Sequence, residues 1–202
     1  GEETPGVWAG LDFLHRVNSG ETPNAGARVV VIGGGDVAMD AARCARRLPG
    51  VSAVHVACLE SRAEMPAHSW EAAEALDEGV VFHNGLGPTA IETAGDKITG
   101  VSFRACTRVF DEQGRFAPQY DDSKTELLAA DTVIVTIGQG IDATGLGADT
   151  GPGGRIMADK DTPATGAPPG ALRSAQIRLP ESRLAMTPTS VRTRSRSTGG
   201  CT

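Results

Sequence analysis

The segment 28–40, which reads RVVVIGGGDVAMD, constrains the fold more than any other part of the chain. Four apolar β-forming residues, 29–32, run directly into three glycines, and small apolar residues at helical spacing follow. A continuous apolar run that ends in glycine is typical of a strand buried on both faces. The segment therefore predicts a strand, a tight turn and a helix, which begin a βαβ unit.

The glycines match the fingerprint that binds the pyrophosphate of a dinucleotide. Gly33 permits the tight turn, Gly35 lets the backbone approach a phosphate, and Ala38 is small enough for the helix to lie close to the strand. The free N–H groups at the helix start face the phosphates. The alternative is a glycine-rich turn that binds nothing. The predicted pyrophosphate site comprises Gly33, Gly34, Gly35, Asp36, Val37 and Ala38.

A second apolar strand, 53–59, ends at Glu60, which lies 22 residues after Ala38. This is close to the spacing of the acid that binds the adenosine ribose in such folds. A carboxylate there favours NAD, because it accepts hydrogen bonds from the ribose hydroxyls and repels a 2′-phosphate. Arg62, two residues on, is the candidate that would favour NADP instead. We expect NAD(P)H to bind here, with a preference for NADH.

The rest of the chain up to Gly138 alternates helical and extended patterns. A helix capped by Thr4, with Pro5 at its first position, is predicted for the apolar stripe that ends near Val17. From residue 88 the pattern changes to short strands with turn-like sequences between them, which indicates an inserted antiparallel β-meander. The predicted elements are helix 36–48, helix 70–77, strand 80–83, meander strands 90–93, 98–109 and 126–130 with turns at 94–97, 111–114 and 120–124, and a buried strand from 131.

These elements predict an α/β fold, a Rossmann-like parallel sheet with an antiparallel meander inserted at about 88–130. We expect an N-terminal helix and linker over 1–27, the dinucleotide domain over 28–150, and a separate tail over 151–202. Ligands of such sheets bind beyond the carboxyl ends of the strands. That rule adds Ile137, Gly138 and Gln139, which follow the last strand, to the predicted site.

The tail differs in kind from the rest of the chain. Residues 151–202 carry a net charge of +5 and residues 1–150 a net charge of −11, and no aromatic residue follows Tyr120. Such a segment buries too little apolar surface to offset its ordering entropy, so a disordered tail is predicted. A shift of reading frame near residue 168 is a further hypothesis for the abrupt loss of pattern.

Charge and cysteine usage exclude several classes of protein. The net charge of −6 argues against nucleic acid as a partner. No apolar run approaches the length of a membrane span, and no signal peptide is recognisable. The four cysteines form no CxxC pair, so neither a zinc nor an iron–sulfur site is predicted within the chain, and a cytoplasmic location is expected. His68 and His83 are candidate acid–base groups by residue type alone, and we interpret them as surface or rim histidines, because no motif places a carboxylate or cysteine partner beside them.

With these residues assigned, the chain resembles the pyridine-nucleotide domain of flavoproteins related to the small (β) subunit of glutamate synthase. Six pieces occur in the family's order between residues 5 and 145. They are GVWAGLDFLHRVNSG, VVVIGGGDVAMDAARCARRL, LESRAEMPA, EALDEGVVFH, VFDEQGRFAPQYD and ADTVIVTIGQG.

The resemblance implies that NAD(P)H passes a hydride to FAD and that electrons continue to an iron–sulfur protein or another acceptor. It also implies that the pyrophosphate lies at the glycine turn and the nicotinamide near Ile137 to Gln139. Both FAD motifs of the family are missing from these 202 residues. FAD-binding segments or a partner subunit are therefore expected to complete the enzyme.

Two other interpretations remain open at this point. The chain is alternatively a non-catalytic dinucleotide-binding or redox-sensing module, which the missing FAD motifs favour. A short-chain dehydrogenase is disfavoured, since the only Tyr-x-x-x-Lys pair, Tyr120 and Lys124, falls in the meander rather than on a helix.

Overall fold

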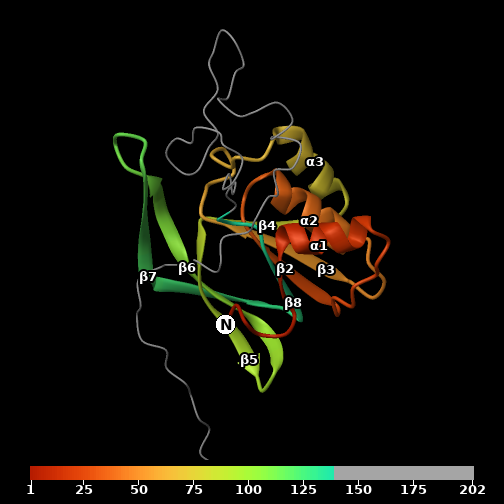
Figure 1. The fold of residues 1–202 in the computed structure, drawn as a ribbon. Helices are drawn as coiled ribbons and strands as arrows, with labels where there is room; N and C mark the ends of the chain where they lie inside the picture. Colours follow the sequence, from red (N-terminus) through yellow and green to blue (C-terminus); the bar gives the residue numbers. More distant parts are fainter. Residues whose placement is uncertain (139–202) are drawn as a thin grey trace, which may run out of the picture.

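A computed structural model describes residues 1–138, which form a parallel sheet, an antiparallel sheet and three helices (Figure 1). The predicted α/β architecture with a parallel sheet and a separate antiparallel meander is confirmed. The predicted tail, the end of the predicted dinucleotide domain and Gln139 lie outside the described residues.

Five parallel strands form the central sheet in the order β1-β8-β2-β3-β4. The buried run after Arg28 forms β2 at its centre, where Val31 pairs with Val56 on one side and with Ile134 on the other. The β2-α2-β3 unit begins and ends within two residues of its predicted bounds. The strands are β1 (Val7–Ala9), β2 (Arg28–Ile32), β3 (Ala53–Cys58), β4 (Val81–Asn84) and β8 (Thr132–Val135).

The helices cover one face of this sheet (Figure 1). The residues that α2 turns toward the strands are small, so the helix packs close to β2 and β3; Ala38, Ala41, Ala42 and Ala45 are fully buried. The helices are α1 (Gly10–Asn18), α2 (Asp36–Arg46) and α3 (Ser69–Asp77).

The antiparallel sheet packs against the opposite face, in the order β5-β6-β7. Its strands are β5 (Leu86–Ala94), β6 (Lys97–Phe110) and β7 (Phe116–Ala129). The central strand β2 is therefore covered on both sides. Val29 and Val31 join the core under the helices, whereas Val30 and Ile32 join the core under the meander. This explains why the strand shows no polar alternation.

The N-terminal helix begins later than the sequence predicts. Residues Val7–Ala9 are extended and pair with β8, and the helix starts at Gly10 with Ala9 as its N-cap. The predicted Thr4 cap and Pro5 start are therefore wrong. Gly6 has φ of +98°, which interrupts a helix at that point. Pairing with a strand far along the chain then overrides the local helical spacing that begins at Val7.

The meander strands are longer than the three short strands that the sequence predicts. The turns at 94–97 and 111–114 are confirmed, but residues 120–124 belong to β7 rather than to a turn. The pairing slips there, because Ala105 pairs with Asp121 and the preceding Arg104 pairs with Thr125. The polar sequence that predicts a turn instead forms an irregularity in the pairing of β6 and β7.

Asp131 joins the starts of β2 and β8. Its Oδ2 accepts hydrogen bonds from the backbone N–H groups of Ala27 (3.0 Å) and Arg28 (2.9 Å), and its Oδ1 lies 2.7 Å from the Arg28 guanidinium. The hydrogen bonds from Arg28 hold the pKa of this carboxyl below its ordinary value. Within residues 1–138, no helix is long and apolar enough to cross a membrane.

Candidate functional site

The glycine turn packs against the end of β8. Gly33 has φ of +141°, and a methyl group added there would lie 2.1 Å from Thr136 Oγ1. Thr136 is fixed in this position because its hydroxyl donates a 2.8 Å hydrogen bond to the Ile32 carbonyl. Only glycine fits at position 33, so the turn brings the start of α2 close to the carboxyl edge of the sheet.

Gly35 differs from Gly33 in what surrounds it. It is the N-cap of α2 with an ordinary extended backbone (φ −95°, ψ 178°), and a methyl group added there would meet no atom of the described residues within 4 Å, its chain neighbours aside. Its carbonyl accepts hydrogen bonds from the N–H groups of Ala38 and Met39. In the described part of the chain the N–H groups of Asp36 and Val37 have no acceptor, as expected for the first turn of a helix. Together with the helix dipole, these groups attract an anion.

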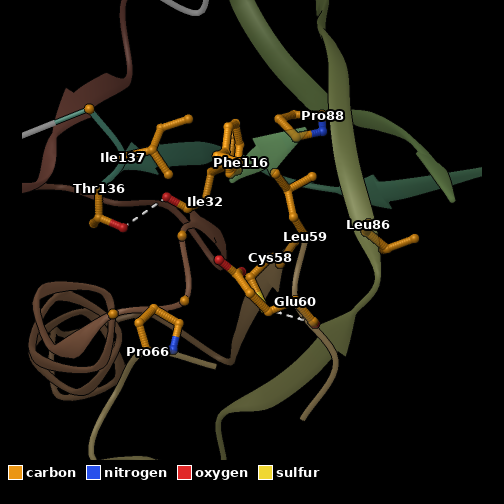
Figure 2. Close-up of a pocket in the computed structure, with 15 residues that line it drawn as sticks. Ile32, Cys58, Leu59, Glu60, Pro66, Leu86, Pro88, Phe116, Thr136 and Ile137 are labelled. Atoms are coloured by element: carbon orange, nitrogen blue, oxygen red, sulfur yellow. Dashed lines mark hydrogen bonds between the residues drawn. The ribbon is translucent and has the colours of Figure 1, made fainter. Parts of the chain in front are cut away.

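A cavity of about 480 Å³ opens in front of this turn (Figure 2). Its walls, as far as residues 1–138 form them, are mostly apolar, and Glu60 is the charged side chain among these residues. They come from the ends of β2, β3 and β8, from the loop after β3, and from the meander. The lining residues are Ile32, Gly33, Gly34, Gly35, Ala57, Cys58, Leu59, Glu60, Pro66, Leu86, Pro88, Phe116, Thr136, Ile137 and Gly138.

Glu60 is held at the cavity wall through its backbone. Its carbonyl accepts hydrogen bonds from the Gly85 N–H and from the Asn84 amide, each at 3.1 Å. The carboxylate lies over the glycine turn, since a methyl group added at Gly34 would come within 3.1 Å of Glu60 Oε2. The acid predicted to bind ribose therefore faces the same cavity as the glycines.

Cys58 contributes an uncharged side chain to the cavity wall. Burial raises the pKa of its thiol to about 12, and the nearby Glu60 carboxylate adds to the rise. The thiol therefore stays protonated near neutral pH. It donates to the Glu60 carbonyl (3.6 Å) and accepts from the Asn84 amide (3.3 Å), and it is not an activated nucleophile.

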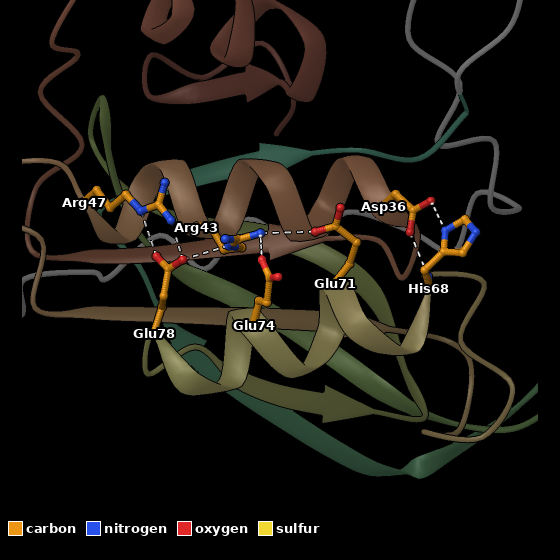
Figure 3. Close-up of polar contacts among 7 residues, drawn as sticks. All are labelled: Asp36, Arg43, Arg47, His68, Glu71, Glu74 and Glu78. Atoms are coloured by element: carbon orange, nitrogen blue, oxygen red, sulfur yellow. Dashed lines mark hydrogen bonds and ion pairs between the residues drawn. The ribbon is translucent and has the colours of Figure 1, made fainter.

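The loop after Glu60 is fastened to the glycine turn (Figure 3). The Ala67 N–H donates to the Gly34 carbonyl (3.0 Å), and the His68 N–H donates to Asp36 Oδ1 (2.8 Å). The His68 ring nitrogen Nδ1 lies 2.7 Å from Asp36 Oδ2. The hydrogen bonds from His68 lower the pKa of Asp36. These contacts hold the loop that places Pro66 in the cavity wall.

Both histidines have carboxylate partners, and the interpretation of a surface or rim histidine holds for His68, which is exposed, whereas His83 is half-buried. His68 pairs with Asp36, and His83 Nδ1 lies 3.2 Å from Glu126 Oε1. These carboxylates come from segments distant in sequence, which is why no local motif indicates them. Within residues 1–138, no group of three or more His, Cys, Asp or Glu side chains is arranged to hold a metal ion.

The structure brings six of the predicted site residues to the cavity, namely Gly33, Gly34, Gly35, Glu60, Ile137 and Gly138. Asp36, Val37 and Ala38 are the first three residues of α2, which follows the turn. The side chain of Ala38 is fully buried. Arg62 does not line the cavity. Its guanidinium lies 4.7 Å from the Phe82 ring centroid, at a neighbouring hollow.

Sequence reasoning missed several of the cavity residues. Thr136 precedes the predicted Ile137 and could have been included by the same rule about strand ends. Leu86, Pro88 and Phe116 come from the antiparallel sheet, and no local pattern indicates that this sheet reaches the glycine turn. Leu59 and Pro66 flank Glu60 in the sequence without a motif of their own.

Known proteins resemble this chain in sequence. A family model described as pyridine nucleotide-disulphide oxidoreductase matches residues 2–168. The β subunit of NADP(+)-dependent formate dehydrogenase from Moorella thermoacetica is 38% identical over 170 residues, which are 81% of this chain and 24% of that protein. The small chain of glutamate synthase [NADPH] from Escherichia coli is 36% identical over 152 residues, or 68% of this chain and 32% of that one. The resemblance to the glutamate synthase small subunit is confirmed, and the chain spans a third or less of these relatives.

The fold is shared with solved reductases. FprA from Mycobacterium tuberculosis superimposes with a TM-score of 0.62 at 22% identity, covering 81% of this chain and 51% of that one. A second structure, described as FprA in complex with NADPH, gives a TM-score of 0.59 over 74% of this chain and 48% of that one, again at 22% identity. At this level of identity the likeness supports the fold alone.

Proposed function

The chain belongs to the pyridine nucleotide-disulphide oxidoreductase family, and from this premise we propose that it is the NAD(P)H-binding portion of a flavin-dependent oxidoreductase. In this proposal a hydride passes from the nicotinamide to FAD, and electrons continue to an iron–sulfur protein or another acceptor. The FAD contacts are assigned to other segments or to a partner subunit, and none is assigned to residues 1–138.

The observation that carries the proposal is the open space at Gly35. Among residues 1–138, a methyl group there would contact nothing beyond its chain neighbours, and the first N–H groups of the helix that starts there have no acceptor. Space of this kind beside a helix N-terminus fits a pyrophosphate, which needs both close approach and N–H donors. Glu60 across the cavity fits a ribose, because a carboxylate accepts hydrogen bonds from two neighbouring hydroxyls.

The chemistry of the reaction would belong to the cofactors, since bound NAD(P)H supplies the hydride. The chain's own residues would bind and orient the dinucleotide. The apolar walls at Ile32, Leu59 and Ile137 would keep water from the nicotinamide. No residue is assigned as a general acid, general base or nucleophile.

The names of the relatives support a multi-subunit enzyme. Two relatives are a β subunit and a small chain, and a third, from Geobacter sulfurreducens, is the β subunit of an NADPH-Fe(3+) oxidoreductase, 36% identical over 64% of this chain and 20% of that one. We propose that this chain likewise works beside partner subunits, in the cytoplasm, with an iron–sulfur protein as one candidate.

The choice between NADH and NADPH rests on two side chains. Glu60 lines the cavity and would repel a 2′-phosphate, whereas Arg62 packs over Phe82 outside the cavity. This arrangement favours NADH, although the relatives above carry NADP or NADPH in their names.

Glu60→Ala is expected to lower the preference for NADH over NADPH about ten-fold, the effect of removing hydrogen bonds to a charged group. Glu64→Ala is the matched control, because the Glu64 carboxylate accepts a hydrogen bond from the Ser61 hydroxyl outside the cavity. An unchanged ratio in Glu60→Ala would contradict the assignment.

Titration of the purified 202-residue chain tests the proposal as a whole. NADH and NADPH are added in a calorimeter, and the absorption spectrum of the same sample is recorded. Saturable binding without a flavin spectrum is expected for a nicotinamide domain whose FAD segments lie elsewhere. A bound flavin would contradict the assignment of FAD to other segments and would also exclude the non-catalytic alternative. Absence of binding by either nucleotide would contradict the proposal.

A further inference from the structure

One cavity wall comes from the antiparallel sheet and includes an exposed aromatic ring. Phe116, the first residue of β7, lines the cavity of the glycine turn although 63% of its surface is exposed to solvent. A large apolar side chain at the mouth of a cavity leaves a face available for a ligand. Residues that merely fill a core are enclosed on all sides, as Phe103 is in the same sheet.

The hairpin that carries Phe116 is braced. Phe110 pairs with Phe116 across the two strands, and their rings meet edge to face with centroids 6.3 Å apart. Asp111 closes the turn by accepting hydrogen bonds from the Arg115 backbone N–H (2.9 Å) and from its guanidinium Nε (2.8 Å). The ring therefore has a fixed support, and a ligand that packs on it gains contact without first ordering a loop.

Phe116 shares one side of the cavity with Ile137. Figure 2 shows Phe116 between Ile137 and Pro88, on the side of the cavity away from Pro66. Ile137 is also exposed, at 41% of its surface. Two apolar side chains that both face an open cavity form a site suited to a flat ring rather than to a sugar or a phosphate.

We propose that Phe116 is a binding residue that stacks on the nicotinamide ring of NAD(P)H. This inference rests on the proposed function and extends it to the meander, which would then contact the ligand directly. If the adenosine ribose lies at Glu60 and the pyrophosphate at Gly35, the second ring of the dinucleotide extends toward Ile137 and Phe116. Adenine would lie at the opposite end, near Pro66.

Three variants of the full chain test the inference. Phe116→Ala removes the ring, and Phe116→Trp keeps an aromatic surface. Leu127→Ala is the matched control, because Leu127 lies on the same strand with the same 63% exposure but does not line the cavity. Calorimetric titrations use NADH and ADP-ribose, which lacks the nicotinamide. Nicotinamide fluorescence of bound NADH is recorded alongside.

Phe116→Ala is expected to weaken NADH binding about ten-fold, as loss of one stacked aromatic contact does. Binding of ADP-ribose should stay within two-fold of the unmodified chain, and Phe116→Trp should restore NADH binding. Fluorescence of bound NADH should change in Phe116→Ala and not in Leu127→Ala, which a merely structural role for Phe116 would not produce.

Two outcomes would overturn the inference. NADH affinity unchanged in Phe116→Ala would show that the ring makes no contact with the dinucleotide. Equal losses for NADH and ADP-ribose would place the contact at the adenosine half or in the fold itself. Both outcomes differ from failure of the proposed function, in which the unmodified chain binds neither NADH nor ADP-ribose.

Discussion

At the scale of single residues, Gly33 and Gly35 show how two glycines of one turn serve different purposes. Gly33 is required by the fold, because any side chain would collide with Thr136. Gly35 has an ordinary backbone conformation, and no side chain of the described residues lies where its own side chain would be. The absence of a side chain is therefore explained by packing at Gly33 and, under the proposal, by a ligand at Gly35.

This contrast yields a prediction about alanine at each position. Gly33→Ala is expected to lower the free energy of unfolding by more than about 2 kcal/mol, through both the collision and the positive φ. Gly35→Ala is expected to leave stability unchanged within about 1 kcal/mol and to weaken NAD(P)H binding at least ten-fold, since its methyl group occupies the space assigned to phosphate. Urea unfolding and calorimetric titration of both variants check this. Full binding by Gly35→Ala would contradict the placement of the pyrophosphate.

The position of single residues at the cavity was predictable from sequence where it depends on near neighbours. Gly33, Gly35 and Glu60 were identified because the strand, turn and helix around them are contiguous. Phe116 was not, since its place at the cavity depends on how a distant hairpin packs. Arg62 is a candidate for the 2′-phosphate only because it follows Glu60 by two residues. Its contact with the ring of Phe82 cannot be predicted from that spacing.

At the scale of elements, α2 and α3 are joined by a polar seam (Figure 3). Arg43 of α2 lies within 2.7–3.2 Å of three carboxylates, those of Glu71 and Glu74 on α3 and that of Glu78, the C-cap residue of α3. Arg47 donates a second set of hydrogen bonds to Glu78. The pKa of Glu78 is lowered by the hydrogen bonds from Arg47 and then from Arg43. The seam sets the position of α3, whose N-cap residue His68 holds the loop beside the glycine turn.

Arg43→Met is expected to lower the free energy of unfolding by about 2 kcal/mol, because Glu71 and Glu74 lose their shared cation while Glu78 keeps Arg47. Arg16→Met is the control, since Arg16 forms an exposed ion pair with Glu21, which is worth at most about 1 kcal/mol. Thermal and urea unfolding of the two variants give the comparison. Equal effects would show that the seam adds nothing beyond an ordinary surface pair.

Elements were predictable to the extent that their partners are near in sequence. The β2-α2-β3 unit was predicted within two residues, because each strand, turn and helix carries its own pattern. The start of α1 was not, since Val7 is extended by pairing with Val133 at the other end of the domain. The sequence predicts a turn at 120–124 for the same reason. This polar segment is extended only because it belongs to β7, which pairs with β6.

At the scale of the whole molecule, a chain of three side chains links the two sheets. His55 of β3 lies 3.0 Å from His83 of β4, nitrogen to nitrogen, and His83 lies 3.2 Å from Glu126 of β7. The contacts are all satisfied when His83 donates to Glu126 and accepts from a neutral His55. Burial, together with the neighbouring His83, lowers the pKa of His55, and Glu126 opposes the shift only in part.

This arrangement predicts a loss of stability in mild acid. The unfolded chain binds a proton at His55 near pH 6.5, whereas the folded chain resists it, so the free energy of unfolding falls as pH drops below that value. His55→Gln is expected to flatten this dependence between pH 7 and 5, and His15→Gln, a change at an exposed position on α1, is expected to leave it intact. Urea unfolding at each pH measures the slope. A slope that is equal in all three proteins would contradict the role of His55.

The strand order also has a consequence for the order in which the protein is made. Strand β8 lies between β1 and β2, yet it is the last of the five strands to leave the ribosome. Until residues 132–135 emerge, β1 has no neighbour and the inner edge of β2 is open. Contacts of such long sequence separation form slowly. The glycine turn also packs against Thr136, so the nascent chain would complete the cavity in front of this turn only after the last strand has emerged.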